Sequence, residues 1–381
     1  MTTLLSARDL HAALELRDLS DPADGPHAMQ LLLEELLTAL TGAWPCTLEL
    51  QRRRPLVSVE DNYDRLGYAA EDVTRDARYS RYAAETVMLR SHTSAGVPPA
   101  LRALAATATA TATAGADVLL ALPGLCHRRD GIDRLHVGTP HQVDLWRIRS
   151  GPATGPLDED DLQQMVELLV GVVLPGALWR TQPARHPYTR SGRQVDVHTA
   201  RGWVELAECG LAAEHVLAGA GLDPGRWSGL ALGLGLDRAL MLRKGIDDIR
   251  LLRSAEPRIA AQLCDLRPWR PVSSQPPVRR DLSVVVDTPV DDELLGDTVR
   301  AALGPAADDL ESVHVVTSTG WADLPPAARD RLGLRPDQVN VLLRLVLRPL
   351  SGTLTDRRAN ELRDEVYAAV HRGRHREWAA R

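Results

Sequence analysis

Four polar residues around one predicted loop have the chemistry to bind a ligand that is both anionic and zwitterionic. Apolar residues lead into the segment 123–148, a charged loop follows, and the run after the loop alternates in polarity. That alternation places Gln142 and Asp144 on one face of a strand. Two extended runs around a polar loop indicate a β-hairpin. We expect one face of this hairpin to carry Arg128 and His136 as well as Gln142 and Asp144.

Each of these residue types suits one part of such a ligand. Arginine holds a phosphate through a planar, two-pronged set of donors, and a carboxylate next to an amide can hold an ammonium group. The four residues therefore predict a site for a phosphate-bearing ligand and an amine together. The alternative is a solvated hairpin face that binds nothing.

A second pattern is a glycine-rich strand that runs into a helix. Residues 230–234 predict a buried strand, and the helix is expected to begin near Leu236. Gly233 and Gly235 would let a ligand or another backbone approach closely, and Arg238 lies in the first turn of the helix. This is not a dinucleotide fingerprint, because Arg238 stands where the third glycine belongs. The alternative is a buried strand with an incidental arginine.

A third candidate is the end of the apolar strand expected within residues 87–94. It would present the imidazole of His92 and the hydroxyls of Thr93 and Ser94 at the strand end. The alternative is a strand terminus followed by a helix cap before Val97.

Composition limits the class of protein. A chain of 381 residues is expected to hold two or three domains. Its net charge is −6, so a contact with nucleic acid must come from local basic patches. The four cysteines form no CxxC pair, which argues against a disulfide framework or structural zinc and favours the cytoplasm. No apolar run reaches the roughly 18 residues of a membrane span, the start lacks a signal-peptide pattern, and we expect no membrane partner.

The predicted elements describe a mixed α+β chain. Leucine spacing predicts an amphipathic helix over 27–40, ended by Gly42 and Pro45. The alanine and threonine tract over 103–116 predicts a poorly specified helix or a linker. An acidic start favours a helix over 157–174.

A proline-rich stretch over 265–277 predicts a domain boundary. The elements beyond it follow the β-α-β-β-α-β order of a ferredoxin-like domain, with strands over 281–286, 312–318 and 339–347, helices over 291–303 and 356–370, and a last strand near Trp378. Arginines outnumber acidic residues over 344–381, which predicts a face that touches RNA. His371 and His375 have a spacing that a metal could use, but without a third ligand we favour a basic tail.

Three segments resemble the signature motifs of class II aminoacyl-tRNA synthetases, and more narrowly those of the single-chain, organelle-type phenylalanyl-tRNA synthetases. They are residues 59–94, which end in His-Thr-Ser, residues 126–146, CHRRDGIDRLHVGTPHQVDLW, and residues 233–252, GLGLDRALMLRKGIDDIRLL. Residues 276–287 and 351–356 resemble the ferredoxin-fold anticodon-binding domain of the same enzymes. The resemblance extends from about residue 55 to the end of the chain.

The resemblance implies a domain plan and a reaction. The plan is a helical appendage over 1–45, a catalytic domain over 46–270 with an antiparallel sheet flanked by helices, and an anticodon-binding domain over 271–381. The reaction is ATP-dependent activation of phenylalanine or a related amino acid, followed by transfer to a phenylalanine-type tRNA. ATP and Mg²⁺ would be the cofactors, the amino acid and tRNA the partners, and a monomer in the cytoplasm is plausible.

The resemblance also implies roles for particular residues. Arg128 and Arg238 would be the catalytic residues: Arg128 would hold the α-phosphate of ATP, and Arg238, with Asp237 beside it, the far phosphates or the adenine. His136 would hold the phosphate tail, and magnesium would bridge the phosphates without a metal ligand that we can name. The amino acid would be fixed by His92, Ser94, Gln142 and Asp144, and its side chain would meet Gln182, Ala184 and Ala231.

The sequence departs from the family pattern at the amino-acid pocket. Asp144 stands where the family usually has glutamate, and Gln182, Pro183 and Ala184 stand where it has Phe-Pro-Phe. The whole chain contains 0 phenylalanines. Either the enzyme still charges phenylalanine and its own synthesis is freed of that tRNA, or the pocket is rebuilt for another amino acid. A third hypothesis is a non-catalytic regulator that binds tRNA.

Overall fold

The computed structural model describes residues 4–72, 75, 80–129, 131–151, 155–272, 276–350 and 352–376, except 111–114, and omits the side chains of 108–110. The chain divides into two compact units. The N-terminal unit comprises Met1–Arg128, Thr139–Ile246 and Leu263–Pro268, and the C-terminal unit comprises Arg129–Gly138, Asp247–Gln262 and Trp269–Arg381. The domain boundaries expected at residues 45 and 270 remain predictions.

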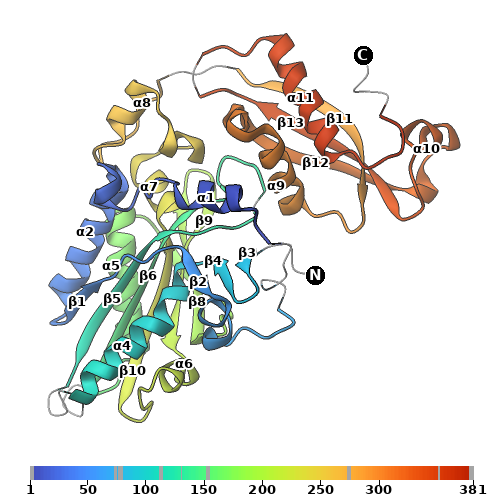
Figure 1. The fold of residues 1–381 in the computed structure, drawn as a ribbon. Coiled ribbons are helices and arrows are strands. Elements are labelled where there is room, and N and C mark those ends of the chain that lie inside the picture. Colours follow the sequence, from blue (N-terminus) through green and yellow to red (C-terminus); the bar gives the residue numbers. More distant parts are fainter. Residues whose placement is uncertain are drawn as a thin grey trace. The chain divides into compact units, whose positions relative to one another are not determined.

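A seven-stranded sheet forms the centre of the N-terminal unit (Figure 1). Its order is β1-β5-β6-β10-β9-β8-β7, and every neighbouring pair is antiparallel except β1 with β5. The strands are β1 Thr47–Leu50, β5 Asp117–Leu125, β6 His141–Ser150, β7 Trp179–Pro183, β8 Thr189–Thr199, β9 Gly202–Ala212 and β10 Trp227–Gly235. The predicted hairpin is confirmed as β5 and β6, and the antiparallel-rich sheet flanked by helices confirms the predicted α+β class.

Helices α2, α5 and α7 pack together, and α2 and α5 meet one face of this sheet at Arg147 of β6. The Arg147 guanidinium lies 2.7 Å from Asp117, 3.6 Å from Asp161 of α5, and 4.3 Å from the centre of the Trp44 ring that ends α2. The helices are α2 Ala28–Ala43, α5 Glu159–Val173 and α7 Leu236–Lys244. Helix α2 passes through Gly42, contrary to the prediction, because a glycine in the last turn leaves the backbone hydrogen bond from Trp44 to Leu40 intact.

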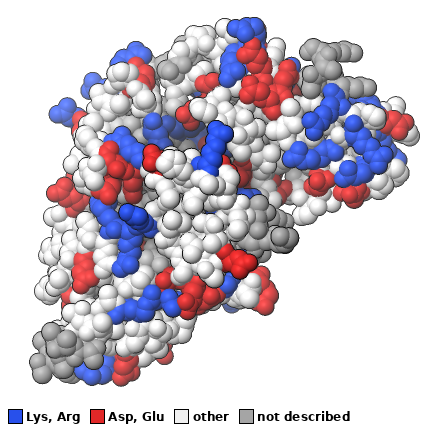
Figure 2. Space-filling model, viewed as in Figure 1, with Lys and Arg blue, Asp and Glu red and all other residues white. Residues whose placement is uncertain are grey.

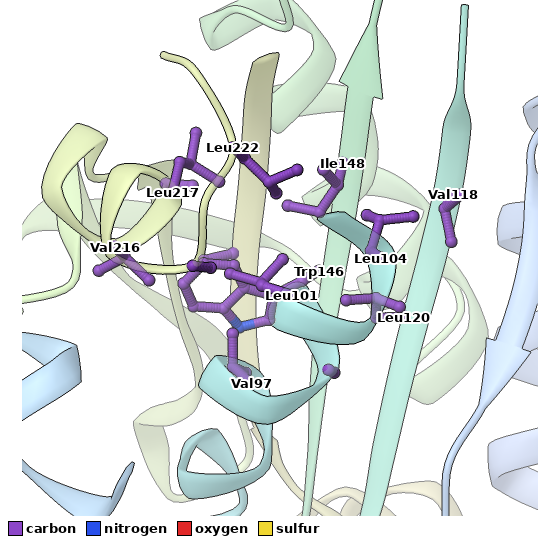
Figure 3. Packing of buried hydrophobic residues seen from close by; sticks show 14 of the residues in the cluster. Val97, Leu101, Leu104, Val118, Leu120, Trp146, Ile148, Val216, Leu217 and Leu222 are labelled. Atoms are coloured by element: carbon purple, nitrogen blue, oxygen red, sulfur yellow. The ribbon is translucent and has the colours of Figure 1, made fainter. Parts of the chain in front are cut away.

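Helices α4 (Val97–Ala110) and α6 (Glu214–Gly219) cover part of the opposite face (Figure 3). Their apolar side chains form one buried cluster with residues of β5, β6 and β10. Labelled members of this cluster are Val97, Leu101, Leu104, Val118, Leu120, Trp146, Ile148, Val216, Leu217 and Leu222. The expected helix in the alanine and threonine tract is the last part of α4, and residues 111–114 of that tract lie outside the described chain.

A smaller sheet and several short helices complete the N-terminal unit. The sheet has the order β2-β4-β3, with β2 Leu56–Ser58, β3 Arg81–Ala84 and β4 Val87–Leu89. The short helices include α1 Ala7–Leu14, α3 Val59–Asn62 and the 3-10 helix Thr93–Gly96. Strand β4 leads through His92 into that 3-10 helix and then into α4, so the residues after β4 are held between a sheet and a helix.

The C-terminal unit contains a three-stranded antiparallel sheet of order β11-β13-β12. Its elements are β11 Val278–Asp287, α9 Asp292–Leu303, β12 Leu310–Gly320, α10 Pro326–Leu332, β13 Gln338–Leu347 and α11 Asp356–Val370, preceded by α8 Pro257–Gln262. Apolar residues of α9 and α11 share a core with alternate residues of the strands. Helix α10 was not predicted, and the last strand expected near Trp378 lies outside the described residues.

Part of the loop between β5 and β6 belongs to the C-terminal unit. Ile132 is buried in that unit's core, and its carbonyl accepts a hydrogen bond from the Val313 backbone at 2.9 Å. Nearby, the Arg134 guanidinium lies 3.1 Å from Asp247 and 3.5 Å from Glu311. Within the described chain, no helix is both long and apolar enough to cross a membrane.

We predict that Leu36→Ala in α2 will lower the free energy of unfolding by about 2–5 kcal/mol, because the side chain is fully buried and its removal leaves a cavity. Leu31→Ala in the same helix is the matched control, since Leu31 is 38% exposed. Urea unfolding followed by circular dichroism measures both variants. Equal losses in the two variants would contradict the packing described for α2.

Candidate active site

One row of side chains crosses the exposed end of the sheet face that carries Trp146. The register pairs Gly233 of β10 with Asp144 of β6 on one side and with Glu208 of β9 on the other. Glu208 is paired in turn with Gln194 of β8, and Gln194 with Gln182 of β7. Because directly paired residues point to the same face, these side chains line up over five strands with a glycine gap between the two carboxylates.

The glycine gap is open. A methyl group added at Gly233 or at Gly235 would meet no atom within 4 Å among the described residues. The two glycines therefore give the row a floor that leaves room above the backbone, as predicted for the glycine-rich strand.

Asp144 is a buried carboxylate held by three neutral donors. Its Oδ2 accepts hydrogen bonds from the Thr93 hydroxyl at 2.7 Å and the Ser94 hydroxyl at 3.0 Å, and its Oδ1 accepts one from the Trp146 indole at 3.2 Å. Burial raises the pKa of Asp144, although these three hydrogen bonds and the charge of Arg90 act in the opposite direction. A carboxylate in this setting favours a cationic partner.

His92 stands beside this carboxylate as a neutral imidazole. Burial, followed by the charges of Arg128 and Arg90, lowers the pKa of His92 to about 3. Its ring stacks on Tyr68 with 5.6 Å between centres. Both ring nitrogens are buried, and a contact with the Asn62 backbone opposes the fall in the pKa of His92.

Gln142 lies on β6 two residues before Asp144. Its side-chain oxygen is 3.4 Å from the Thr93 backbone nitrogen and 3.3 Å from the sulfur of Cys126. Burial raises the pKa of the Cys126 thiol to about 12, so this thiol stays protonated. The predicted set of His92, Ser94, Gln142 and Asp144 is thus brought together by β4, the turn after it, and β6.

Arg128 follows β5 at the edge of this group. Its Nε donates to the backbone carbonyl of Ser91 at 2.8 Å, which fixes the guanidinium next to the His-Thr-Ser turn. Its positive charge contributes to lowering the pKa of His92 and of Glu208, so it lies within electrostatic reach of both. The arrangement can present a cation to an anion bound over the sheet.

Aromatic rings close the deep end of the site. The Tyr188 ring lies 6.1 Å from Trp146, 6.3 Å from Tyr68 and 5.7 Å from His186, measured between centres. Burial raises the pKa values of Tyr68 and Tyr188, and the charges of Asp144 and Glu208 reinforce the effect. Both phenols therefore lie close to both carboxylates.

The outer part of the row is a polar network. Gln182 is exposed on the edge strand β7, and its amide donates to Asp196. Asp196 also accepts from Gln194 at 2.7 Å and from Arg180 at 3.1 Å. Burial would raise the pKa of Asp196, but these three hydrogen bonds outweigh it and hold that pKa below its usual range. Ala184, at the end of β7, bonds through its backbone nitrogen to Gly192.

Helix α7 begins directly after Gly235, at the end of β10 that carries the glycine gap. The Asp237 carboxylate accepts from the His141 backbone nitrogen and lies 3.0 Å from the His141 ring. These buried contacts anchor the first turn of α7 to the start of β6. Arg238 is 27% exposed and donates to the Glu205 carbonyl at 3.1 Å.

Two other predicted residues lie elsewhere. Ala231 is 1% exposed and belongs to the apolar cluster beneath Trp146. His136 is part of the C-terminal unit, where its ring Nδ1 lies 2.7 Å from the Asp133 carboxylate. The placement of His136 beside Arg128 and Asp144 remains a prediction.

Comparisons with known proteins identify the family of the chain. The family described as tRNA synthetases class II core domain (F) matches residues 24–263, well over half of the chain. The chain belongs to this family. The site described above lies within the matched residues, so the resemblance seen in the three sequence segments is confirmed for the synthetase core.

Individual relatives of this class II chain are phenylalanine–tRNA ligases by name. It is 33% identical to the alpha subunit from Prochlorococcus marinus over 53% of its own length and 56% of the relative's, and 31% identical to that from Leptospira biflexa, over 53% and 59%. It is 24% identical to the chloroplastic/mitochondrial enzyme of Arabidopsis thaliana over 84% of its own length and 70% of the relative's. The chain thus spans little more than half the length of the alpha subunits.

One solved structure compared with this class II chain is a pyrrolysyl tRNA synthetase, PylSc, of Desulfitobacterium hafniense. The TM-score is 0.44 and the identity 16%, over 60% of this chain and 74% of that one.

The synthetase core carries side chains that suit the phosphates of ATP. Arg128 and Arg238 are partly exposed guanidinium groups suited to phosphates. The described residues contain no group of three or more His, Cys, Asp or Glu side chains placed to hold a metal ion.

Sequence reasoning missed four residues of the site: Tyr68, Tyr188, His186 and Glu208. Glu208 lies in a segment expected to form strands, but the sequence does not show which strands pair with it. The tyrosine content of residues 59–94 was a visible signal for Tyr68.

We predict that Asp237→Ala will lower the free energy of unfolding by about 1–3 kcal/mol, because the buried backbone nitrogen of His141 loses its acceptor. Glu167→Ala, at an exposed position of α5, should change it by less than about 0.5 kcal/mol. Thermal unfolding by calorimetry measures both. An Asp237 variant as stable as the Glu167 variant would refute the anchoring role.

Proposed function

We propose that the chain is an aminoacyl-tRNA synthetase of the phenylalanine–tRNA ligase type. It would activate phenylalanine or a related amino acid with ATP and transfer it to tRNA. The observation that carries the proposal is the buried Asp144 carboxylate, lined by hydroxyl donors and set beside a neutral His92 and the Arg128 guanidinium. The names of the relatives support the same reaction.

The geometry suggests how the amino acid would be oriented. Its ammonium group would bind Asp144, where the carboxylate lacks a cationic hydrogen-bond partner among the described residues. Gln142 and His92 would add uncharged polar contacts, and the glycine floor at Gly233 would leave room for the main chain of the amino acid. The α-carboxylate would then point away from Asp144, because like charges repel.

Activation needs positioning and neutralisation of charge, and no side-chain nucleophile. An oxygen of the amino-acid carboxylate would attack the α-phosphorus, the bond to the pyrophosphate oxygen would break, and pyrophosphate would leave. Arg128, held by Ser91, would hold the α-phosphate. Arg238 would take the far phosphates or the adenine and His136 the phosphate tail, and Mg²⁺ would supply further neutralisation of phosphate charge. Transfer would then release AMP as a hydroxyl of the terminal adenosine takes the aminoacyl group.

The C-terminal unit would bind tRNA as a ferredoxin-like anticodon-binding domain, and its three-stranded antiparallel sheet, which shares a core with α9 and α11, supports this. Figure 2 shows arginines gathered on the viewed face of this unit, interspersed with acidic residues. Several are already paired, such as Arg344 with Asp281 at 2.6 Å. A tRNA phosphate would have to compete with those carboxylates, so we expect affinity that falls steeply with salt.

The domain plan over 1–45, 46–270 and 271–381, the cytoplasmic location and the monomeric state belong to the same proposal. Catalytic and anticodon-binding domains in one chain suit a monomer, whereas the name alpha subunit of several relatives points to an assembly. Light scattering of the purified chain decides between them.

A second candidate function is activation of a different amino acid for a biosynthetic pathway. The polar Gln182 and the carboxylate of Glu208 on the row favour it, because a phenyl ring gains nothing from either group. A non-catalytic tRNA-binding regulator would not need both the buried Asp144 carboxylate and the Arg128 guanidinium.

We predict that Arg238→Ala will reduce amino-acid-dependent ATP–pyrophosphate exchange by at least about a hundredfold, since a positioned cation on the phosphates is worth several kcal/mol in the transition state. Arg243→Ala, at the far end of the same helix where it pairs with Glu35 at 3.3 Å, is the control and should keep most of the activity. Full exchange by the Arg238 variant would exclude the proposed ATP contact.

A further inference from the structure

Glu208 occupies the side of the glycine gap opposite Asp144. One strand, β10, separates β6 from β9, so their backbones at this row are about 9–10 Å apart. Gly233 contributes no side chain between them. A ligand bound to Asp144 and lying across the gap would therefore end against Glu208.

Glu208 is held in place as an anion. His186 Nε2 lies 3.2 Å from its Oε1, and the His186 ring is fixed by stacking on Tyr188 and by the Thr189 hydroxyl 3.2 Å from Nδ1. The close approach of His186 is the main reason why the pKa of Glu208 lies below its ordinary value, and the charge of Arg128 adds to the effect. The Glu208 side chain is 43% exposed.

Aromatic rings of the chain pack together beside the row. Tyr188 is in contact with both Trp146 and Tyr68, and it lies against the apolar cluster that contains Ala231. The side facing Glu208 is instead polar, with Gln194 and Gln182 next along the row. The row thus has a carboxylate on each side of the glycine gap.

We infer that Glu208, positioned by His186, binds a hydrogen-bond donor at the end of the substrate's side chain, and that the site prefers an amino acid with a short amine-bearing side chain to phenylalanine. This inference rests on the proposed function. With hydrogen bonds of about 2.8 Å at each end, the two amine nitrogens would be roughly 4–7 Å apart across the gap. Diamino acids with two or three methylene groups in the side chain fit this span.

A phenyl ring in the same place would desolvate Glu208 and add no partner to His186, whereas an ammonium would pair with the carboxylate. Sites built to bind a polar group reject an analogue that lacks it far more strongly than apolar pockets reject an added one. The ratio of kcat/KM for an amine-bearing amino acid to that for its hydrocarbon isostere therefore measures the contact with Glu208.

The test is ATP–pyrophosphate exchange by the full chain with ornithine, 2,4-diaminobutyrate, norleucine, phenylalanine and the other standard amino acids. Norleucine matches ornithine in shape and lacks its side-chain amine. Wild type is compared with Glu208→Gln, which keeps the shape and removes the charge, and with Glu208→Ala. Glu167→Ala, exposed on α5, is the matched control.

We expect wild type to prefer a diamino acid over its hydrocarbon isostere by at least about a hundredfold in kcat/KM. Both Glu208 variants should lose most of this ratio, while the control keeps it. A preference for phenylalanine that the Glu208 variants leave unchanged overturns the inference and leaves the proposed function standing. An equal loss of exchange for all amino acids would make Glu208 a structural partner of His186 and also overturn it. No exchange with any amino acid would refute the proposed function itself.

Discussion

The buried carboxylate of Asp144 sets the conditions that the rest of the site has to meet. A carboxylate removed from water is stable only if donors surround it. Thr93, Ser94 and Trp146 supply them, and Thr93 and Ser94 belong to the turn between β4 and α4. The Asp144 carboxylate on β6 therefore holds the turn between β4 and α4 against the large sheet. The hydroxyls satisfy its lone pairs without neutralising it, which leaves the carboxylate suited to an ammonium.

The side chains next to Asp144 are uncharged or small, which keeps the carboxylate free for a cationic ligand. Burial and two nearby arginines keep His92 neutral, so it adds polarity without adding a competing positive charge. Gly233 keeps the space beside Asp144 open, and the next strand supplies a second carboxylate at Glu208. Asp144 and Glu208 therefore flank the open space over Gly233, with Arg128 nearby. A ligand bound to both carboxylates would extend from β6 towards β9.

Much of this could be predicted where the signal is local. The polarity alternation before Trp146, the glycine strand before α7 and the acidic cap at Asp158 of α5 are each written within a few residues, and each element formed where expected. Helix α10 also has local signals, Pro326 at its start and the left-handed Gly333 after its end, which were not used.

The part that could not be predicted depends on strand order and register. Gln182 joins the row through β8, and bulges near Arg190 and at Val195 shift the pairing of β8, so an alternating pattern alone does not say which residues share a face. Tyr188 reaches Trp146 only because β8 and β6 are brought together by two intervening strands. Contacts of that kind are properties of the folded sheet and have no counterpart in the spacing of the sequence.

We expect the amino acid to lie over Gly233 with its ammonium on Asp144 and its activated carboxyl towards Arg128. The most direct test is a crystal structure of the full chain with a non-hydrolysable aminoacyl-adenylate analogue. The account predicts the analogue's amine within about 3 Å of Asp144 and its phosphate mimic beside Arg128. An analogue bound with its amine away from Asp144, or elsewhere on the chain, would contradict it.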